Sequence, residues 1–198
     1  MSKRIFDFTV ALLLTVLFLP LFILIALLIK CDSQGPVLFI QQRVGKNNKD
    51  FGIFKFRTMF TGAEQKGQLT VGKDNRITRT GRVLRKYKLD ELPQLFNVIK
   101  GDMSLVGPRP EVRKYVELYN DEQKKVLNVK PGITDTASIQ FADENDLLAG
   151  SDDPEKKYIT EIMPAKLNLN LQYIAHQSFR TDLKILAQTF FRIFLKKR

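Results

Sequence analysis

The sequence predicts a helix-rich α+β fold that begins with a membrane-associated helix. A long uncharged apolar run lies near the N-terminus, and two segments of strand-like composition, 37–42 and 51–56, follow it around a polar turn. Apolar residues then recur at helical spacing within 82–99 and again within 183–194. A small β-hairpin set among helices, several of them amphipathic, is the architecture that these patterns indicate.

The N-terminal apolar run predicts a membrane element. Residues 8–29 carry no charge, and about 22 residues at a rise of ~1.5 Å give about 33 Å, enough for a bilayer core of roughly 30 Å. The run ends without a small-x-small cleavage site, so we expect it to be retained rather than removed as a signal peptide. Pro20 lies near its middle and clashes with the carbonyl of Val16, which predicts a bend.

Two topologies fit this bend, namely a kinked span and a re-entrant helix that enters and leaves on one face. Lys3 and Arg4 precede the run, while Lys30 and further basic residues follow it. A straight crossing would leave one basic flank on the wrong side, whereas a re-entrant helix keeps both on the cytoplasmic face. Because this charge bias is statistical, the residues alone leave both topologies open.

The remaining elements are predicted from local signals. Residues 61–80 are rich in Gly, Thr and charge and predict a mobile surface loop. Two short helices are expected within 82–99, a helix over 111–127 and a strand over 137–141. Asp153 followed by Pro154 predicts a cap and the first turn of another helix.

The C-terminal segment 179–198 predicts a basic amphipathic helix. One face would carry Leu183, Leu186, Ala187, Phe190, Ile193 and Phe194, and the chain ends in Lys-Lys-Arg. Such a helix would lie well in a membrane interface. Packing against the protein's own core explains the apolar stripe equally well, so both interpretations stay open.

The composition indicates an anionic partner and excludes several kinds of site. There are 32 Lys and Arg residues against 21 Asp and Glu, a net charge of +11, which favours lipid headgroups, nucleotides or nucleic acid. Cys31 is the only cysteine and His176 the only histidine, which excludes a disulfide framework and a Cys/His zinc cluster. Any metal site must therefore be built from oxygen ligands.

The segment 88–98, Lys-Leu-Asp-Glu-Leu-Pro-Gln-Leu-Phe-Asn-Val, places the adjacent acids Asp90 and Glu91 before a helix that has Pro93 in its first turn. The simpler interpretation is a helix cap and a dipole complement. The same geometry also supports chemistry, because exposed N–H groups would keep Asp90 ionised as a nucleophile and would hold phosphate oxygens. A Mg2+ ion shared with a diphosphate would relieve the repulsion between Asp90 and Glu91.

Two further motifs present cations. Gly-Pro-Arg-Pro at 107–110 holds Arg109 on a rigid backbone suited to bidentate phosphate contact. Lys55 and Arg57 stand at the end of a predicted strand. Taken singly, the first motif reads as a turn whose Arg pairs with an acid, and the second as a solvated strand edge. Pro-Gly-Ile-Thr at 131–134 reads as a turn leading into a strand.

Taken in order, these pieces resemble the monotopic phosphoglycosyl transferases, bacterial sugar transferases that initiate glycan assembly on undecaprenyl phosphate. The resemblance covers about the first two thirds of the chain, from the basic start and the proline-broken run to the Pro-Gly-Ile-Thr motif. It implies one domain over 1–198, with a re-entrant helix within 1–30 broken at Pro20. A catalytic portion over 31–178 would face the cytoplasm at the bacterial inner membrane, and 179–198 would form the last helix.

The resemblance also implies a ping-pong mechanism with Mg2+ as cofactor. Asp90 would attack the β-phosphate of a UDP-sugar and expel UMP, and a polyprenol phosphate would then take over the phosphosugar. Glu91 would assist the second step or the metal, while Lys55, Arg109 and, more weakly, Arg57 would bind phosphate. The implied partners are the UDP-sugar, the polyprenol phosphate and the bilayer, but no nucleic acid. A homo-oligomer or pathway glycosyltransferases stay open as partners.

The chain departs from the family pattern at two places. Segment 135–145 contains no Arg, whereas the more usual Gln-Val-Asn-Gly-Arg stretch has one that is expected near the nucleotide. Leu19 precedes Pro20 where some relatives have Ser. Asp182 resembles an acid of the family's last helix and is expected to be structural.

Two alternative functions stay open. A membrane-bound diphosphate hydrolase would use the same carboxylates and metal with water as acceptor. A basic, membrane-anchored binding protein would suit the positive charge and would tolerate Asp90→Asn.

Overall fold

The computed structural model describes residues 3–63 and 74–194, and it is a helix-rich α+β structure, as predicted. Its strands are β1 (Leu38–Val44), β2 (Asp50–Phe56), β3 (Ser104–Val106) and β4 (Gly132–Thr134). Its α-helices are α1 (Lys3–Leu17), α2 (Leu19–Asp32), α3 (Arg79–Lys86), α4 (Gln94–Lys100), α5 (Arg113–Val116), α6 (Thr136–Gln140), α7 (Glu144–Ala149), α8 (Pro154–Lys157), α9 (Met163–Ala175) and α10 (Phe179–Phe194). Half of the predicted loop 61–80, residues 64–73, lies outside the described residues.

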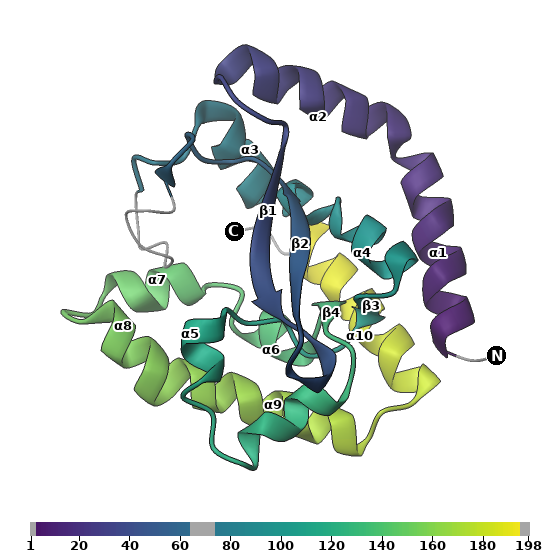
Figure 1. Cartoon of the computed structure of the whole chain (residues 1–198), viewed down its shortest axis with the longest axis vertical. Coiled ribbons are helices and arrows are strands. Elements are labelled where there is room, and N and C mark those ends of the chain that lie inside the picture. Colours follow the sequence, from purple (N-terminus) through teal and green to yellow (C-terminus); the bar gives the residue numbers. More distant parts are fainter. Residues whose placement is uncertain (1–2, 64–73, 195–198) are drawn as a thin grey trace.

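α1 and α2 meet at a bend of 60° and form an arc along one side of the molecule (Figure 1). The break falls at Phe18, so Pro20 lies in the first turn of α2, where its missing N–H is not needed. No single described helix is long and apolar enough to cross a membrane, whereas this bent pair together meets both requirements. The predicted bend is therefore confirmed, two residues earlier than Pro20.

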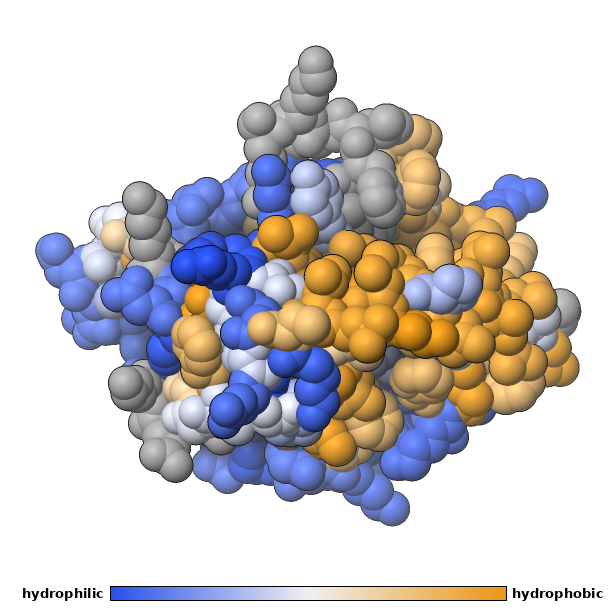
Figure 2. All heavy atoms as spheres, turned by 90° about the horizontal axis from the view of Figure 1, so that it is seen from above, coloured by the Kyte–Doolittle hydropathy of each residue, from blue (hydrophilic) through white to orange (hydrophobic). Residues whose placement is uncertain are grey.

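The outward face of the α1–α2 pair carries a continuous series of exposed apolar side chains, visible as the orange area of Figure 2. These are Leu12, Leu13, Val16, Leu17, Leu19, Ile23, Leu24, Leu27 and Leu28. The inward face of α1 forms hydrogen bonds to the rest of the protein. Arg4 donates to the carbonyls of Val98 and Ile99 at 2.5 and 2.8 Å, and buried Asp7 accepts from Ser104 Oγ at 2.7 Å. The pair therefore leaves an apolar face outward, although Phe22, Ile25 and Ile29 of α2 are buried in the core on its inward side.

The predicted hairpin is confirmed, because β1 and β2 pair antiparallel with Phe39 opposite Lys55. Asn97 of α4 is fully buried against β2. Its Oδ1 accepts from the N–H of Phe54 at 2.9 Å, and its Nδ2 donates to the carbonyl of Gly52 at 2.8 Å. This amide fixes the strand that carries Lys55 against the helix that follows Asp90.

β3 and β4 pair in parallel, with Ser104 opposite Gly132 and Val106 opposite Thr134. Just beyond this pairing the two backbones approach so closely that a Cβ on Gly132 would lie 2.1 Å from the nitrogen of Gly107. The Gly-Pro-Arg-Pro and Pro-Gly-Ile-Thr motifs therefore form one structural unit. The strand predicted after Pro131 is confirmed, and its partner is β3.

Two predictions for the middle of the chain need correction. The strand expected over 137–141 is wrong, because Asp135 caps a helix there by accepting from Ser138 N at 2.6 Å, and this cap stabilises α6. The helix expected over 111–127 forms only as α5 and a separate 3-10 helix, η4 (Gln123–Asn128). By contrast, Asp153 caps α8 through Lys156 N at 3.0 Å, as predicted.

The last helix, α10, packs on the core through Asp182 and Ile185, while Leu183 and Phe190 of the predicted stripe are 43% and 56% exposed. Asp182 is buried and accepts from the Tyr173 hydroxyl at 2.6 Å, and it pairs with Lys3 Nζ at 2.5 Å. This acid joins the two ends of the fold, which is a structural role.

Candidate active site

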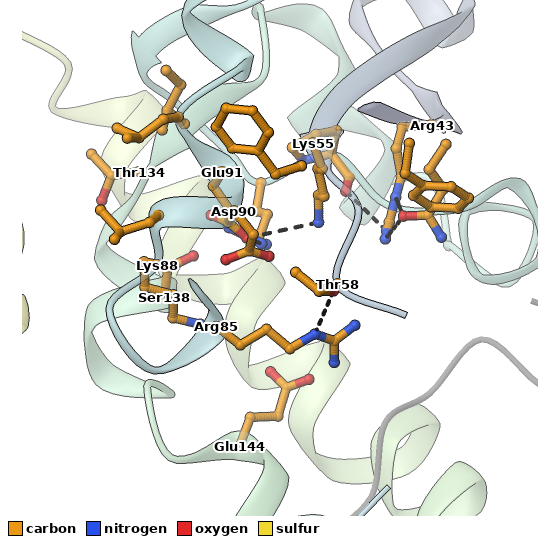
Figure 3. Close-up of a pocket in the computed structure, with 18 of the residues that line it drawn as sticks. Arg43, Lys55, Thr58, Arg85, Lys88, Asp90, Glu91, Thr134, Ser138 and Glu144 are labelled. Atoms are coloured by element: carbon orange, nitrogen blue, oxygen red, sulfur yellow. Dashed lines mark hydrogen bonds and ion pairs between the residues drawn. The ribbon is translucent and has the colours of Figure 1, made fainter. Parts of the chain in front are cut away.

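An open cleft of about 1760 Å³ collects the residues that the sequence singled out (Figure 3). Its lining comes from the α1–α2 break, the hairpin, α3, the Arg109 loop, α6, α9 and α10. Ligand pockets commonly measure roughly 300–1,000 Å³, so this open cleft is larger than a usual site for one small ligand.

Asp90 lies at this cleft in a short 3-10 helix, η3 (Leu89–Glu91), which directly precedes α4, so the two acids stand before this helix as predicted. Lys88 adopts a left-handed conformation with φ of 56° and reverses the chain after α3. The N–H groups of Glu91 and Leu92 bond to the carbonyls of Lys88 and Leu89, both at 3.3 Å, so they are not available for phosphate. This corrects the expectation that the N–H groups at a helix start would serve the substrate.

The Asp90 side chain is buried, and its Oδ1 has no hydrogen-bond partner within 3–63 and 74–194. Burial and the adjacent carboxylate of Glu91 raise the pKa of Asp90 above its ordinary value, while Lys55 and Arg85 act in the opposite direction. The ionised form therefore depends on side-chain cations, and not on a helix terminus as expected.

Glu91 is fully engaged by cations. Arg109 Nη1 donates to Oε2 at 3.2 Å, Arg109 Nη2 donates to Oε1, and Lys55 Nζ lies 3.7 Å from Oε1. Burial alone would raise the pKa of Glu91, but Arg109 and then Lys55 outweigh it and hold the pKa well below its ordinary range. Glu91 is therefore a permanent anion that positions two cations.

The predicted metal ligands Asp90 and Glu91 fit a cation unequally. No group of three or more His, Cys, Asp or Glu side chains suited to a metal occurs among the described residues. Both oxygens of Glu91 are already bonded, which argues against it as a ligand. The unpartnered Oδ1 of Asp90 fits a Mg2+ ion, because Mg2+ often takes one carboxylate together with substrate phosphates.

Lys55 extends from β2 toward Asp90 and Glu91 (Figure 3). Burial lowers its pKa to about 8, although Glu91 partly offsets this effect. Its charge therefore titrates close to physiological pH, unlike that of an exposed lysine.

Asp135 positions the loop that carries Arg109. Its Oδ2 accepts from the backbone N–H of Arg109 at 3.1 Å while its Oδ1 caps α6 through Ser138 N. Glu91 raises the pKa of Arg109, so this guanidinium stays charged. No role was predicted for Asp135, which belongs to the segment 135–145 that departs from the family pattern.

Arg57 does not join the ion-paired group of Lys55, Glu91 and Arg109. Its guanidinium donates to the carbonyls of Gln34 and Ser33, each at 2.7 Å, and the residue is 5% exposed. These carbonyls follow the C-terminal end of α2, where cations are favoured. Arg57 therefore joins the hairpin to the apolar helix pair, and because it also lines the cleft, its predicted phosphate contact stays a prediction.

Two arginines at the cleft were missed by sequence reasoning. Arg85 Nε donates to Thr58 Oγ1 at 2.9 Å, and burial lowers its pKa while Asp90 acts against this shift. Arg43 Nη1 donates to Glu111 Oε1 at 2.9 Å. The spacing of Arg82 and Arg85, both of which line the cleft, places them on one helical face and was an available signal. Arg43 gave no such signal.

Comparison with known proteins identifies the family. A family model described as bacterial sugar transferase matches residues 1–196. The chain belongs to this family. The assignment made from the motifs is thereby confirmed.

Several relatives of this chain have names that state the reaction they catalyse. An undecaprenyl-phosphate glucose phosphotransferase of Komagataeibacter xylinus is 40% identical over 96% of this chain and 35% of that protein. A UDP-glucose:undecaprenyl-phosphate glucose-1-phosphate transferase of Caulobacter vibrioides is 38% identical over 96% of this chain and 68% of that protein.

A UDP-N-acetylgalactosamine-undecaprenyl-phosphate N-acetylgalactosaminephosphotransferase of Aeromonas hydrophila is 49% identical over 69% of this chain and 33% of that protein. The chain thus spans about a third of the length of the Aeromonas and Komagataeibacter relatives. All three names contain undecaprenyl phosphate, and the sugar is glucose in two of them and N-acetylgalactosamine in the third.

Proposed function

We propose that this protein transfers a sugar 1-phosphate from a UDP-sugar to undecaprenyl phosphate and releases UMP, as the first membrane step of glycan assembly. The observation that carries the proposal is the buried Asp90 carboxylate, whose Oδ1 has no partner in the described part of the chain and which lies beside Lys55 and Arg85. A buried anion facing an open cleft and surrounded by cations suits attack on a phosphate that those cations neutralise.

The reaction proceeds in two displacements at one phosphorus atom. An oxygen of Asp90 bonds to the β-phosphorus, and the bond from that phosphorus to the bridging oxygen breaks, so UMP leaves with the bridging oxygen. An oxygen of undecaprenyl phosphate then bonds to the same phosphorus and releases the carboxylate. Neither displacement requires a proton, because each leaving group departs as an anion that Lys55, Arg85 and Arg109 can neutralise.

Glu91 acts by holding Lys55 and Arg109 in place. Mg2+, when bound by Asp90 and the diphosphate oxygens, would supply further neutralisation of the phosphate charge. Each Glu91 oxygen already accepts from Arg109, whereas Asp90 Oδ1 is unpartnered in the described part of the chain, so Asp90 is the residue of the predicted pair that we retain as its ligand.

The acceptor reaches the site from the apolar helix pair. Leu14, Phe18 and Leu21, which flank the bend between α1 and α2, line the same cleft as Asp90. An isoprenoid chain would lie along these side chains with its phosphate toward the cations. The proposal includes a re-entrant pair in a bacterial membrane with the catalytic side facing the cytoplasm, where the basic residues on both flanks of the pair are favoured.

Covalent trapping tests the nucleophile. Purified protein is incubated with UDP-sugars labelled in the sugar, without acceptor, and protein-bound label is counted. Wild type and Asp146→Asn, a matched control at an exposed acid of the same cleft, should retain label, and Asp90→Asn should not. Label retained on Asp90→Asn would falsify the assignment, and steady UMP release without undecaprenyl phosphate would instead indicate a hydrolase.

Accessibility labelling tests the topology. Native Cys31 is exposed at the end of α2, and Ser2→Cys in a Cys31→Ser background places a thiol at the opposite end of the pair. A re-entrant pair exposes both thiols to an impermeant reagent from the cytoplasmic side. Labelling of the two positions from opposite sides would establish a kinked span.

A further inference from the structure

The α9 wall of the cleft contains a buried amide with no partner. Asn170 is 4% exposed and lines the cleft, and its Oδ1 accepts no hydrogen bond from any residue that the structure describes. Leaving such a group unpaired costs about 1–3 kcal/mol, so buried side-chain amides are normally satisfied. An unsatisfied amide facing a cleft points to a ligand that completes it.

The surroundings of Asn170 are apolar on several sides. Met163 and Leu167 of α9 line the same cleft, and they form one hydrophobic cluster with Leu148 and the partly buried Phe141. Charged groups that line the cleft nearby are paired with one another, Lys166 with Glu144 at 2.7 Å and Arg192 with Asp143 at 2.6 Å. The subsite is therefore a neutral, mostly apolar space.

A second unpartnered atom lies on the neighbouring helix. α6 packs against α9, and Ser138 of α6 lines the cleft with its Oγ buried and without a partner in the described part of the chain. Asp135 accepts from the backbone N–H groups of both Ser138 and Arg109. This shared carboxylate places the Ser138 side of the subsite directly beside the proposed phosphate site.

These features fit a flat ring with apolar faces and a neutral hydrogen-bonding edge. Uracil has such an edge, in which one N–H stands between two carbonyl oxygens. An amide accepts from that N–H while it donates to an adjacent carbonyl, and a serine hydroxyl can donate to a carbonyl as well. A hexose would instead turn hydroxyl groups against the side chains of Met163 and Leu167, at the cost of their desolvation.

We propose that Asn170, assisted by Ser138, binds the imide edge of the uracil ring of the nucleotide donor, between Met163 and Leu167 of α9 and the Phe141 segment. The inference rests on the proposed function and adds the site that recognises the base. It also supplies a nucleotide contact in a chain that has no Arg within 138–145. A neutral base needs no cation, so an amide is sufficient.

Direct binding tests the assignment without knowledge of the sugar. Calorimetric titration of the purified full chain in detergent uses UMP, 3-methyl-UMP, whose ring N–H is blocked, and ribose 5-phosphate, which has no base. Wild type should bind UMP about 10-fold more tightly than 3-methyl-UMP, the effect of one lost hydrogen bond. Asn170→Ala should bind the two nucleotides equally and should bind ribose 5-phosphate as wild type does.

Two further variants make the result decisive. Asn170→Leu replaces the amide by an apolar group of similar size that suits its surroundings, so it should fold even where alanine does not. Asn168→Ala, at an exposed amide on the same helix, should keep the wild-type preference. A 10-fold preference for UMP that persists in both Asn170 variants, or an equal loss of ribose 5-phosphate binding, overturns the assignment. Wild type that binds UMP no better than ribose 5-phosphate instead overturns the proposed donor itself.

Discussion

Arg109 donates a hydrogen bond to each carboxylate oxygen of Glu91, with Nη1 3.2 Å from Oε2. Because of this ion pair, the adjacent acids Asp90 and Glu91 have different roles. Glu91 is neutralised by Arg109 and Lys55, whereas Asp90 keeps an oxygen that is unpartnered in the described part of the chain. Identical carboxyl chemistry therefore has two roles that depend on the environment of each side chain.

Breaking the Arg109–Glu91 pair should cost stability as well as activity. Arg109→Leu leaves Glu91 buried and without its main partner, which destabilises proteins by about 3 kcal/mol or more. The double variant Arg109→Leu with Glu91→Gln should recover most of this loss, because the unpaired charge is gone, yet it should stay inactive. Thermal unfolding in detergent and UMP release measure the two effects. A double variant as unstable as Arg109→Leu would contradict the pairing argument.

Activity should show a bell-shaped dependence on pH. Asp90 must be ionised, so kcat/KM falls as pH decreases through its pKa, which burial and Glu91 raise above the ordinary 3.8. Lys55 must be protonated to neutralise phosphate, so kcat/KM falls as pH increases through its pKa of about 8. Lys55→Arg should remove the alkaline limb, since the pKa of arginine is roughly 12.5 or higher.

Lys86→Arg, at an exposed lysine of the same cleft, is the matched control for Lys55. It should keep the alkaline limb near pH 8. An unchanged limb in Lys55→Arg would show that another group titrates there.

Asp90→Asn should abolish transfer and raise thermal stability. A carboxyl whose pKa is raised on folding is destabilising wherever it is ionised, so the gain should be largest above the raised pKa of Asp90 and should shrink as pH decreases through that pKa toward the ordinary 3.8. Asp135→Asn is the contrasting variant. Its carboxylate accepts from Arg109 N and Ser138 N, so its loss should lower stability. A lower unfolding temperature for Asp90→Asn at pH 8 would mean that the cations outweigh burial.

Local signals in the sequence predicted much of the fold. The bend before Pro20, the hairpin and the cap at Asp153 each depend on residues close together in the chain. The strand expected over 137–141 is wrong because the cap at Asp135 starts a helix there, despite the β-type composition of the segment. Local competition of this kind is decided by one hydrogen bond, which composition does not reveal.

The site was predicted less completely because its geometry depends on distant segments. Arg57 lies two residues from Lys55, yet the carbonyls at Ser33 and Gln34 engage its guanidinium. The N–H groups of Glu91 and Leu92 were expected to be free, but the left-handed turn at Lys88 is followed by a 3-10 helix that bonds them. A contact between distant segments decides the first outcome and one backbone conformation the second, and neither can be read from the spacing of the residues.

The contact between Gly107 and Gly132 should be essential to the position of Arg109. A Cβ on Gly132 would lie 2.1 Å from Gly107 N and 2.5 Å from its carbonyl oxygen, and neither backbone can move without displacing the Gly-Pro-Arg-Pro loop. Gly132→Ala should therefore lower the unfolding temperature and reduce UMP release at least 10-fold. Gly150→Ala, where an added Cβ meets nothing within 4 Å, should change neither quantity. Wild-type activity in Gly132→Ala would mean that this close approach does not position the arginine.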